Sequence, residues 1–314
     1  MIRTFELQAG GLAECGGGGV WIDLFDPTEA ERAAAAAVLG FAPPSKAEQQ
    51  EIELSSRLYV QNGATVMTAM LPAHTEADQA EMGPVTFILS KDVLVTLRHH
   101  DPRPFSTYPT RADRSALACA SPVSVFLGLV EDVIGRLADL TEYAGRKIEQ
   151  LTRQVFFPPE GAKPNLRTRL YKIGWRDALV THIRDACVTI ERMLSFLAPI
   201  LERRGEAKDV LDFLNMQLRD AHTISEQAGF LMQKTAFLLD AMMGFINIEQ
   251  SAITKMFSIV AVVFLPPTLV ASIYGMNFEF MPELAEPFGY PMAIGAMVIS
   301  AVLPLIYFKR RGWF

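Results

Sequence analysis

Residues 274–284 (YGMNFEFMPEL) contain several oxygen-bearing side chains and neither Lys nor Arg. Asn277 supplies an amide, Glu279 and Glu283 supply carboxylates, and Glu286 follows just beyond. Carboxylates that stand without basic neighbours raise the local concentration of cations. This segment is therefore a candidate site for attracting positively charged ligands, and the elements on either side of it must hold it in place.

Both flanking elements are long apolar runs. No charged residue occurs between residues 256 and 278, and none occurs between residues 287 and 308. A helix rises about 1.5 Å per residue, so each run would extend roughly 33 Å, enough to cross a hydrocarbon core of about 30 Å. We therefore predict a transmembrane hairpin with spans at about residues 256–276 and 288–308.

Basic residues predict the orientation of this hairpin. Lys255 precedes the first span, and Lys309, Arg310 and Arg311 follow the second, whereas the loop between the spans has no basic residue. Lys and Arg concentrate on the cytoplasmic side of membrane proteins. Both chain termini are therefore predicted to be cytoplasmic, with the loop outside.

The rest of the chain shows two kinds of sequence pattern. Residues 1–120 alternate short β-like runs with loops and one alanine-rich helix, which is typical of a soluble cytoplasmic α/β domain. Residues 121–254 show helical patterns and form a predicted stalk, and residues 255–314 form the hairpin. The last stalk helix is predicted to run from about residue 206 to residue 277, into the first span. The predicted fold class is α+β.

A stripe of small and polar residues follows this last helix, with steps that alternate between four and three residues, the spacing of a helix-bundle seam. The stripe comprises Asp240, Gly244, Asn247, Ser251, Thr254, Ser258, Ala261, Leu265, Thr268 and Ser272. All of these except Leu265 are small or polar. Close packing of membrane helices would explain the part inside the bilayer. Asp240 and Asn247 would be costly in a dry seam, so a water-filled path shared by several copies of the chain explains the stripe better.

The quoted segment, the second span and the basic, aromatic end YFKRRGWF closely resemble the CorA family of magnesium and cobalt channels. The signature of that family is a Gly-Met-Asn motif, which is Gly275, Met276 and Asn277 in this chain. The stretches MGFINIEQ and VVFLPPTLVAS resemble its enterobacterial-type branch. The close match covers about residues 240–314, and the resemblance is weaker upstream.

This resemblance implies a homopentameric funnel in the bacterial inner membrane that takes up Mg²⁺, and also Co²⁺ and Ni²⁺, and that is not an enzyme. The expected partners are further copies of the same chain, the lipid bilayer and these cations. Mg²⁺ would be both substrate and regulatory ligand, with no resident cofactor. No phosphate loop, nucleophile–base pair or basic nucleic-acid patch is evident in the sequence, so no nucleic-acid partner is expected.

The chemistry of Mg²⁺ suits the motif. Mg²⁺ is a small, hard ion that gives up its water shell reluctantly. A ring of Asn277 amides, together with the Gly275 carbonyls, would accept hydrogen bonds from the bound waters, and neutral ligands bind weakly enough to release the ion. Glu279, Glu283 and Glu286 would enrich cations outside this filter. Two plainer alternatives are a helix C-cap for Asn277 and an ordinary solvated loop for the glutamates.

The resemblance also places the pore-lining positions of the family on the stripe, at Thr268, Leu265, Ala261, Thr254, Ser251 and Asp240. Relatives commonly carry asparagine at the position of Ser251 and can carry methionine at that of Thr254. Phe257 is a candidate for a hydrophobic constriction that closes the pore by dewetting. Packing against a neighbouring helix would explain Phe257 equally well.

Feedback control is a further implication of the resemblance. Intracellular Mg²⁺ is expected to bridge neighbouring cytoplasmic domains and hold the pore shut. The regulatory carboxylates of the family correspond to Glu51 and Glu131, with Asp220 only near the third position, which Met216 occupies in strict register. Scattered surface acids are the alternative explanation of these residues.

Two other functions are compatible with the sequence. The related zinc transporter group called ZntB shares the two-span hairpin but usually replaces the methionine of the motif. Met276 and the MPEL that ends the quoted segment therefore favour the magnesium branch. A membrane-anchored structural or sensor protein would not need a polar stripe that continues through the bilayer.

Overall fold

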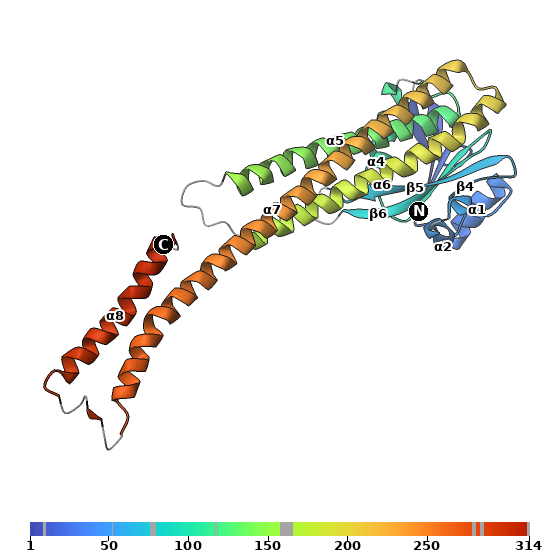
Figure 1. Ribbon diagram of the computed structural model, residues 1–314. Coiled ribbons are helices and arrows are strands. Elements are labelled where there is room, and N and C mark those ends of the chain that lie inside the picture. The colour runs from blue at the N-terminus through green and yellow to red at the C-terminus, as the bar shows by residue number, and fades with distance from the viewer. Residues whose placement is uncertain are drawn as a thin grey trace. The chain divides into compact units, whose positions relative to one another are not determined.

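The structure is a computed structural model. It describes residues 1–8, 11–51, 53–75, 80–115, 117, 119–157, 166–277, 281–282 and 286–312, without the side chain of Leu54. The chain divides into two compact units, unit 1 (Met1–Leu239) and unit 2 (Asp240–Phe314). Strands and short helices come first along the chain, and long helices follow (Figure 1). The predicted domain boundaries near residues 120 and 254 stay predictions.

Unit 1 is built on a seven-stranded sheet with the order β2-β1-β3-β7-β6-β5-β4. The strands are β1 (Ile2–Gln8), β2 (Gly11–Cys15), β3 (Trp21–Phe25), β4 (Leu58–Gln61), β5 (Ala64–Ala73), β6 (Glu81–Leu89) and β7 (Leu94–Arg98). Neighbouring strands are antiparallel, except that β3 and β7 run parallel with Trp21 opposite Leu94. Asn62 and Gly63 join β4 to β5 with φ angles of 48° and 78°, which suit a tight hairpin turn.

Short helices connect the strands, and long helices form the rest of the chain. The short ones are α1 (Glu29–Leu39), α2 (Lys46–Gln50), α3 (Leu54–Arg57), α4 (Pro104–Thr107) and the 3-10 turns η1 (Tyr108–Thr110) and η2 (Ala112–Arg114). The long ones are α5 (Pro122–Phe156), α6 (Leu166–Arg204), α7 (Lys208–Tyr274) and α8 (Gly289–Arg310). Capping boxes start α1 at Thr28 and α2 at Ser45. The single long helix predicted from about residue 206 is confirmed as α7.

Helices cover both faces of the sheet in unit 1 (Figure 1). Successive side chains of a strand point to opposite faces. Along β3, Ile22 and Leu24 pack into one core cluster with Ala35 of α1, whereas Trp21 contacts Phe105 of α4 on the other side. α6 packs on β5, and α5 packs on β6 and β7. The residues of β5 are therefore almost all buried, as expected for a strand covered on both faces.

Aromatic rings fix α4, η1 and α5 against the sheet. Phe5 stacks on Trp21 with ring centres 4.6 Å apart, and Phe87 meets Phe126 of α5 edge-on at 5.4 Å. A Cβ atom on Gly128 of α5 would lie 2.3 Å from the Tyr108 hydroxyl, so only glycine lets η1 approach α5 this closely. This contact sets one wall of the pocket described below.

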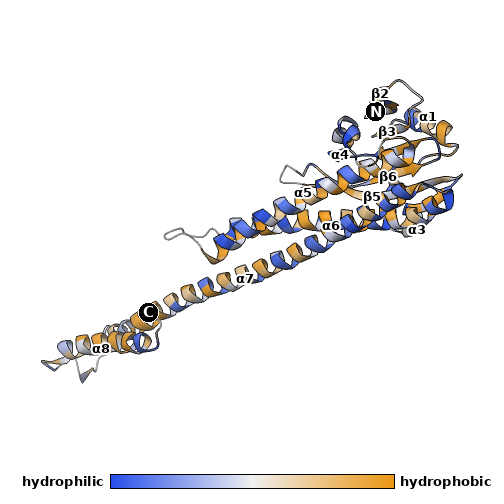
Figure 2. Ribbon diagram, turned by 90° about the horizontal axis from the view of Figure 1, so that it is seen from above, coloured by the Kyte–Doolittle hydropathy of each residue, from blue (hydrophilic) through white to orange (hydrophobic). Residues whose placement is uncertain are grey.

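Unit 2 contains the C-terminal part of α7 and the whole of α8. α7 and α8 each include a stretch long and apolar enough to cross a membrane, with mean hydropathy of 2.2 and 2.0. Figure 2 shows α8 as almost continuously hydrophobic, whereas polar and apolar residues alternate along α5 and α6. Only 6% of the apolar stretch of α7 and 0% of that of α8 is buried. Apolar surface of this extent requires lipid or other chains to cover it.

Candidate functional site

α7 ends at Tyr274, immediately before the Gly-Met-Asn motif. The amide of Gly275 still donates to the carbonyl of Ala271 at 3.0 Å, and the amide of Met276 donates to that of Ile273 at 3.3 Å. A Cβ atom on Gly275 would lie 3.1 Å from the Ala271 carbonyl oxygen, which is tighter than ordinary contact. The motif therefore continues the last helical turn, and glycine leaves room for the chain to turn away there.

Asn277 lies at the exposed end of the motif. Among the described residues Asn277 is not one with a positive φ, so it does not form a left-handed cap on α7. Its side-chain amide makes no hydrogen bond in the described part of the loop and is available to water or to a hydrated ion. Glu286 is also exposed, and its backbone carbonyl accepts a hydrogen bond from the amide of Gly289. Glu279 and Glu283 lie outside the described residues.

All ten residues of the polar stripe are exposed on α7 in the single chain. The hydroxyls of Thr254, Ser258 and Thr268 donate to carbonyls four residues earlier, at 2.9, 2.9 and 2.7 Å. Each hydroxyl proton is thus used within the helix, and the oxygen lone pairs are left as acceptors. Such a face accepts hydrogen bonds from water, which suits the bound waters of a hydrated cation. The sequence pattern predicted polar residues on this face, but it did not reveal that these hydroxyls would present only acceptors to water.

Pro266 and Pro267 lie inside α7. Proline has no amide hydrogen, so the carbonyls of Val262 and Val263 lose their usual helical donors. Within a bilayer, such carbonyls are tolerated where neighbouring helices or pore water satisfy them. They add two acceptors beside the stripe residue Ala261. Phe257 has a side chain that is 66% exposed in the single chain, and its role in gating or packing stays a prediction.

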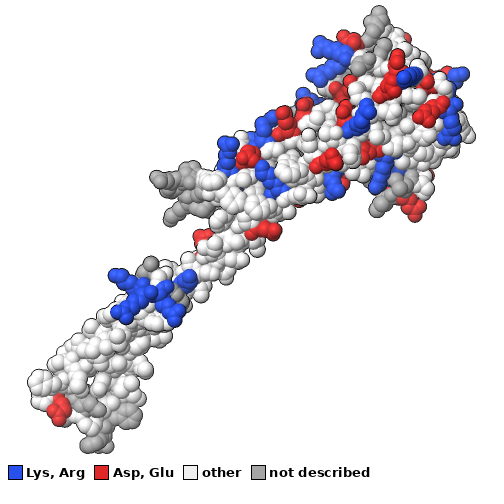
Figure 3. Space-filling model, turned by 45° about the horizontal axis from the view of Figure 1, so that its top comes forward, with Lys and Arg blue, Asp and Glu red and all other residues white. Residues whose placement is uncertain are grey.

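Charged residues of unit 2 flank its long apolar stretches, and Asp240 and Glu249 precede the first of them on α7. Figure 3 shows Lys and Arg clustered at one end of an otherwise uncharged surface, and Asp or Glu at the other. The basic residues in this part of the sequence are Lys255, Lys309, Arg310 and Arg311. A membrane hairpin whose turn and termini face opposite sides has this distribution of charge.

The three predicted regulatory carboxylates lie on different elements. Glu51 is the exposed C-cap of α2, Glu131 is half-buried on α5, and Asp220 is exposed on α7. Glu131 accepts a hydrogen bond of 2.8 Å from the hydroxyl of Ser115. Across the described ranges, no group of three His, Cys, Asp or Glu side chains lies close enough together to hold a metal ion. One chain therefore does not assemble a complete regulatory site from the residues described.

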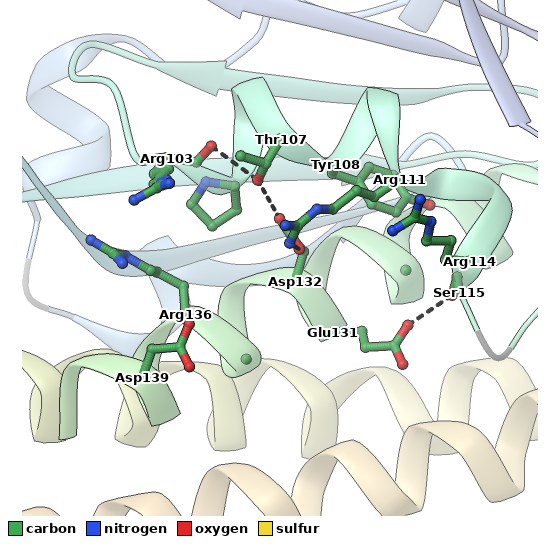
Figure 4. Close-up of a pocket in the computed structure, with 13 residues that line it drawn as sticks. Arg103, Thr107, Tyr108, Arg111, Arg114, Ser115, Glu131, Asp132, Arg136 and Asp139 are labelled. Carbon is green, nitrogen blue, oxygen red and sulfur yellow. Dashed lines mark hydrogen bonds and ion pairs between the residues drawn. The ribbon is translucent and has the colours of Figure 1, made fainter. Parts of the chain in front are cut away.

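An arginine-rich pocket surrounds Glu131, and sequence patterns did not reveal it (Figure 4). It encloses about 580 Å³ between α4, η1, η2 and the first part of α5. Its charged lining residues are Arg103, Arg111, Arg114, Glu131, Asp132, Arg136 and Asp139. Thr107 donates to one carboxylate oxygen of Asp132 at 2.6 Å, and Arg111 lies 3.9 Å from the other. Burial raises the pKa of the Tyr108 phenol, so this lining residue stays neutral.

Fold and site together define a class of membrane protein: an α/β body followed by one long helix that enters a two-helix hairpin with a polar face and an amide at the turn. Residues 16–310 match the family described as CorA-like Mg²⁺ transporter protein. The chain therefore belongs to the CorA-like Mg²⁺ transporter family, and the predicted family is confirmed.

Curated relatives and solved structures agree with this assignment. The chain is 37% identical over 294 residues to the magnesium transport protein CorA of Mannheimia succiniciproducens, which covers 94% of this chain and 92% of the relative. The identity to the magnesium transport protein CorA of Escherichia coli K12 is 36% over 302 residues, with the same coverage. Both relatives are named for magnesium transport, so the comparisons do not favour the ZntB alternative.

Two solved structures share the fold. The CorA magnesium transporter of Methanocaldococcus jannaschii superposes with a TM-score of 0.74 at 15% identity, covering 100% of this chain and 98% of that one. The full-length CmaX protein gives a TM-score of 0.63 at 14% identity, covering 99% and 97%. At these identities the two structures support the fold alone.

Proposed function

We propose that this chain is one subunit of a homopentameric channel that carries Mg²⁺, and also Co²⁺ and Ni²⁺, into the cell across the inner membrane. Relatives that align with 94% of the chain are named for magnesium transport. The observation that carries the proposal is the exposed polar face of α7, which runs through an apolar helix and ends near the amide of Asn277. In a lone membrane helix this face would lie in lipid, together with the carbonyls that Pro266 and Pro267 leave without donors, and unsatisfied backbone acceptors are costly there.

Several copies of α7 around one axis would remove this cost. Their stripes would line a water-filled bore, and the back-bonded hydroxyls of Thr254, Ser258 and Thr268 would present oxygen acceptors to the hydrated ion. A ring of Asn277 amides at the outer end would accept hydrogen bonds from the waters bound to Mg²⁺, so the ion need not lose its shell to pass.

The membrane potential supplies the driving force. Each elementary charge that crosses the membrane gains about 2.3 kcal/mol per 100 mV, so a divalent ion gains about 4.6 kcal/mol. With the basic ends of the hairpin on the cytoplasmic side, both termini and unit 1 lie inside and the loop with Glu286 lies outside. This arrangement places acidic side chains where cations approach and lets the potential draw them inward.

Ion influx into liposomes tests the proposal. The purified protein is reconstituted, and Mg²⁺ influx is followed with an enclosed fluorescent indicator for the wild type and for Asn277→Ala. We expect influx in the wild type and a loss of at least about tenfold in the variant, because a tenfold change corresponds to about 1.4 kcal/mol, the scale of one lost polar contact.

The matched control is Asn215→Ala, which removes an exposed asparagine of α7 in unit 1 and should leave influx unchanged. Parallel measurements with Co²⁺, Ni²⁺ and Zn²⁺ define the ion preference. A wild type that passes Zn²⁺ but not Mg²⁺ would support the ZntB-like alternative, and a protein that is monomeric in lipid would contradict the pore.

Closure by intracellular Mg²⁺ is the second part of the proposal. Glu51 and Glu131 are expected to bind Mg²⁺ between neighbouring subunits, because a single chain does not gather enough ligands in its described residues. Raising Mg²⁺ on the unit 1 side should inhibit influx in the wild type, and Glu51→Ala with Glu131→Ala should weaken that inhibition. An unchanged Mg²⁺ dependence in the double variant would show that these carboxylates are not the sensors.

A further inference from the structure

The pocket around Arg111 has the dimensions of a small-molecule site. Its volume of about 580 Å³ lies within the range of roughly 300–1,000 Å³ typical of ligand pockets. Gly135 of α5 lies on its wall, and a Cβ atom there would meet no atom within 4 Å. The pocket is thus genuinely open beside Gly135, and it lies wholly within unit 1.

Four arginines line this pocket and reach it from separate elements. Arg103 precedes α4, Arg111 lies between η1 and η2, Arg114 ends η2 and Arg136 lies on α5. Figure 4 shows Arg103 and Arg136 at one end, Arg114 at the other and Arg111 between them over Asp132. The planar guanidinium group matches the geometry of phosphate oxygens. Arginines spread along a pocket suit an anion that carries several phosphates rather than one.

Carboxylates that lie among these arginines specify the ligand further. Asp132 and Asp139 line the same pocket on α5, and hydrogen bonding from Thr107 holds Asp132 in place. These carboxylates would repel a bare polyphosphate. A polyphosphate in complex with Mg²⁺ matches both kinds of group, because the arginines would contact phosphate oxygens and the carboxylates would contact the metal ion or its bound waters.

We propose that this pocket binds the magnesium complex of a polyphosphate, such as that of a nucleoside triphosphate. Among the described lining residues none offers an exposed aromatic ring for a base, since the ring of Tyr108 is buried. Recognition therefore rests on phosphates and metal, and the identity of the base has little influence. The protein would in this way read the magnesium-bound phosphate pool of the cell at a site separate from its pore.

Binding to the purified full-length protein in detergent tests this site by isothermal titration calorimetry. The probes are MgATP, MgGTP, magnesium tripolyphosphate, ATP with a chelator, and inorganic phosphate. We expect the three magnesium complexes to bind with similar affinity at millimolar concentrations or below. The chelated ATP and inorganic phosphate should bind at least about tenfold more weakly, the change that one lost charged contact produces.

Two variants locate the site. Arg111→Ala with Arg114→Ala removes two exposed guanidinium groups, and Gly135→Leu fills the open space without altering any charge. Both should weaken MgATP binding by at least about tenfold, comparable to the loss of one charge-assisted contact. Arg146→Ala is the matched control, since Arg146 lies on the same helix outside the pocket and its side chain is 61% exposed. Thermal unfolding of each variant checks that the fold is retained.

Several outcomes would overturn the proposal. Absence of MgATP binding at millimolar concentration removes the ligand, and equal binding by all variants places it elsewhere. Equal binding with a chelator removes the metal from the complex. Inorganic phosphate that binds as tightly as tripolyphosphate, or ATP that binds when tripolyphosphate does not, removes the polyphosphate as the recognised group. Binding does not depend on ion conduction, so the test is independent of the proposed channel.

Discussion

Units 1 and 2 differ in where their polar side chains lie and in what they bond to. In unit 1, the carboxylate of Asp23 on β3 is buried. It accepts hydrogen bonds from Thr96 at 2.7 Å and from Arg98 at 2.9 Å. The indole of Trp21 donates to Thr96 at 3.0 Å, so the network closes within one chain. In unit 2, the polar stripe of α7 is exposed, and the side-chain hydrogen bonds described for it, from Thr254, Ser258 and Thr268, all go to carbonyls of the same helix.

This difference separates a unit that is complete as a single chain from one that is not. Buried polar groups are stable when hydrogen-bonded partners surround them, and unit 1 provides these partners itself. Unit 2 combines apolar helices with a continuous polar edge, so it needs lipid on one side and water or further copies on the other. Variants in the buried polar network of unit 1 should therefore change stability, and variants on the polar edge of α7 should change ion flux.

The largest effect is expected from Arg98→Met in unit 1. Arg98 and Asp23 are 4% and 1% exposed at their side chains, and Arg98 also lies over the rings of Phe25 and Phe105 at 4.5 and 4.8 Å. Removing the cation leaves a buried carboxylate without a counter-ion, which costs about 3–5 kcal/mol of unfolding free energy. A denaturant titration of the purified protein, followed by tryptophan fluorescence, measures this loss.

The control for Arg98 is Arg146→Ala, because the Arg146–Glu142 pair is exposed and contributes less than about 1 kcal/mol. An Arg98 variant that is as stable as this control would show that the buried network is dispensable. Unit 1 would then not owe its independence to internal pairing, and the contrast between the units would weaken.

The next effect tests the polar edge itself. Ala261→Leu places a bulky apolar group on the stripe, and Val262→Phe makes an addition of similar bulk on the neighbouring face of the same helix. Hydrophobic constriction of a wet pore obstructs ions by dewetting. Mg²⁺ influx should fall at least about tenfold in the first variant, equivalent to about 1.4 kcal/mol, and much less in the second. Equal effects of the two variants would contradict a single pore-facing edge.

Local sequence signals predicted much of the membrane part and of the long helices. The two spans, the continuous α7 and the polar stripe each follow from residues close together in sequence, where periodicity is informative. The Gly-Met-Asn motif likewise pointed to the family that the comparisons confirm. The side-chain amide of Asn277 is exposed and makes no hydrogen bond in the described part of the loop. Its role in a selectivity filter is still a proposal.

Contacts between residues far apart in the chain could not be predicted from the sequence. Asp23 and Arg98 lie 75 positions apart, and they meet only because β3 and β7 pair in parallel. The pocket arginines were missed for the same reason, since they come from separate elements between residues 103 and 136. The hydroxyl direction in Thr254 and Thr268 depends on helix geometry rather than on residue type. None of these features produces a periodic pattern.

The smallest effect is a pH dependence of unit 1, in which all five histidines lie. His100 is 6% exposed, and its Nε2 lies 2.8 Å from the carbonyl oxygen of Leu71, which accepts the proton of the neutral ring. Its ring fits over Gly83, where a Cβ atom would lie 2.6 Å from Nδ1. Burial lowers the pKa of His100 below its ordinary value.

The lowered pKa of His100 fixes the sign of the effect. The unfolded chain takes up a proton at His100 below about pH 6.5, whereas the folded protein does so only at lower pH. The contribution of His100 to the free energy of unfolding is therefore fully present above this pH and is lost as the pH drops toward the folded pKa. The variant His100→Gln keeps a donor for Leu71 and should flatten the decline in melting temperature between about pH 7.5 and pH 5.5. His74→Gln, at an exposed site, should leave the decline unchanged. A decline that persists in His100→Gln would mean that the acid sensitivity arises outside this ring and would assign it to other titrating groups, including the carboxylates of unit 2.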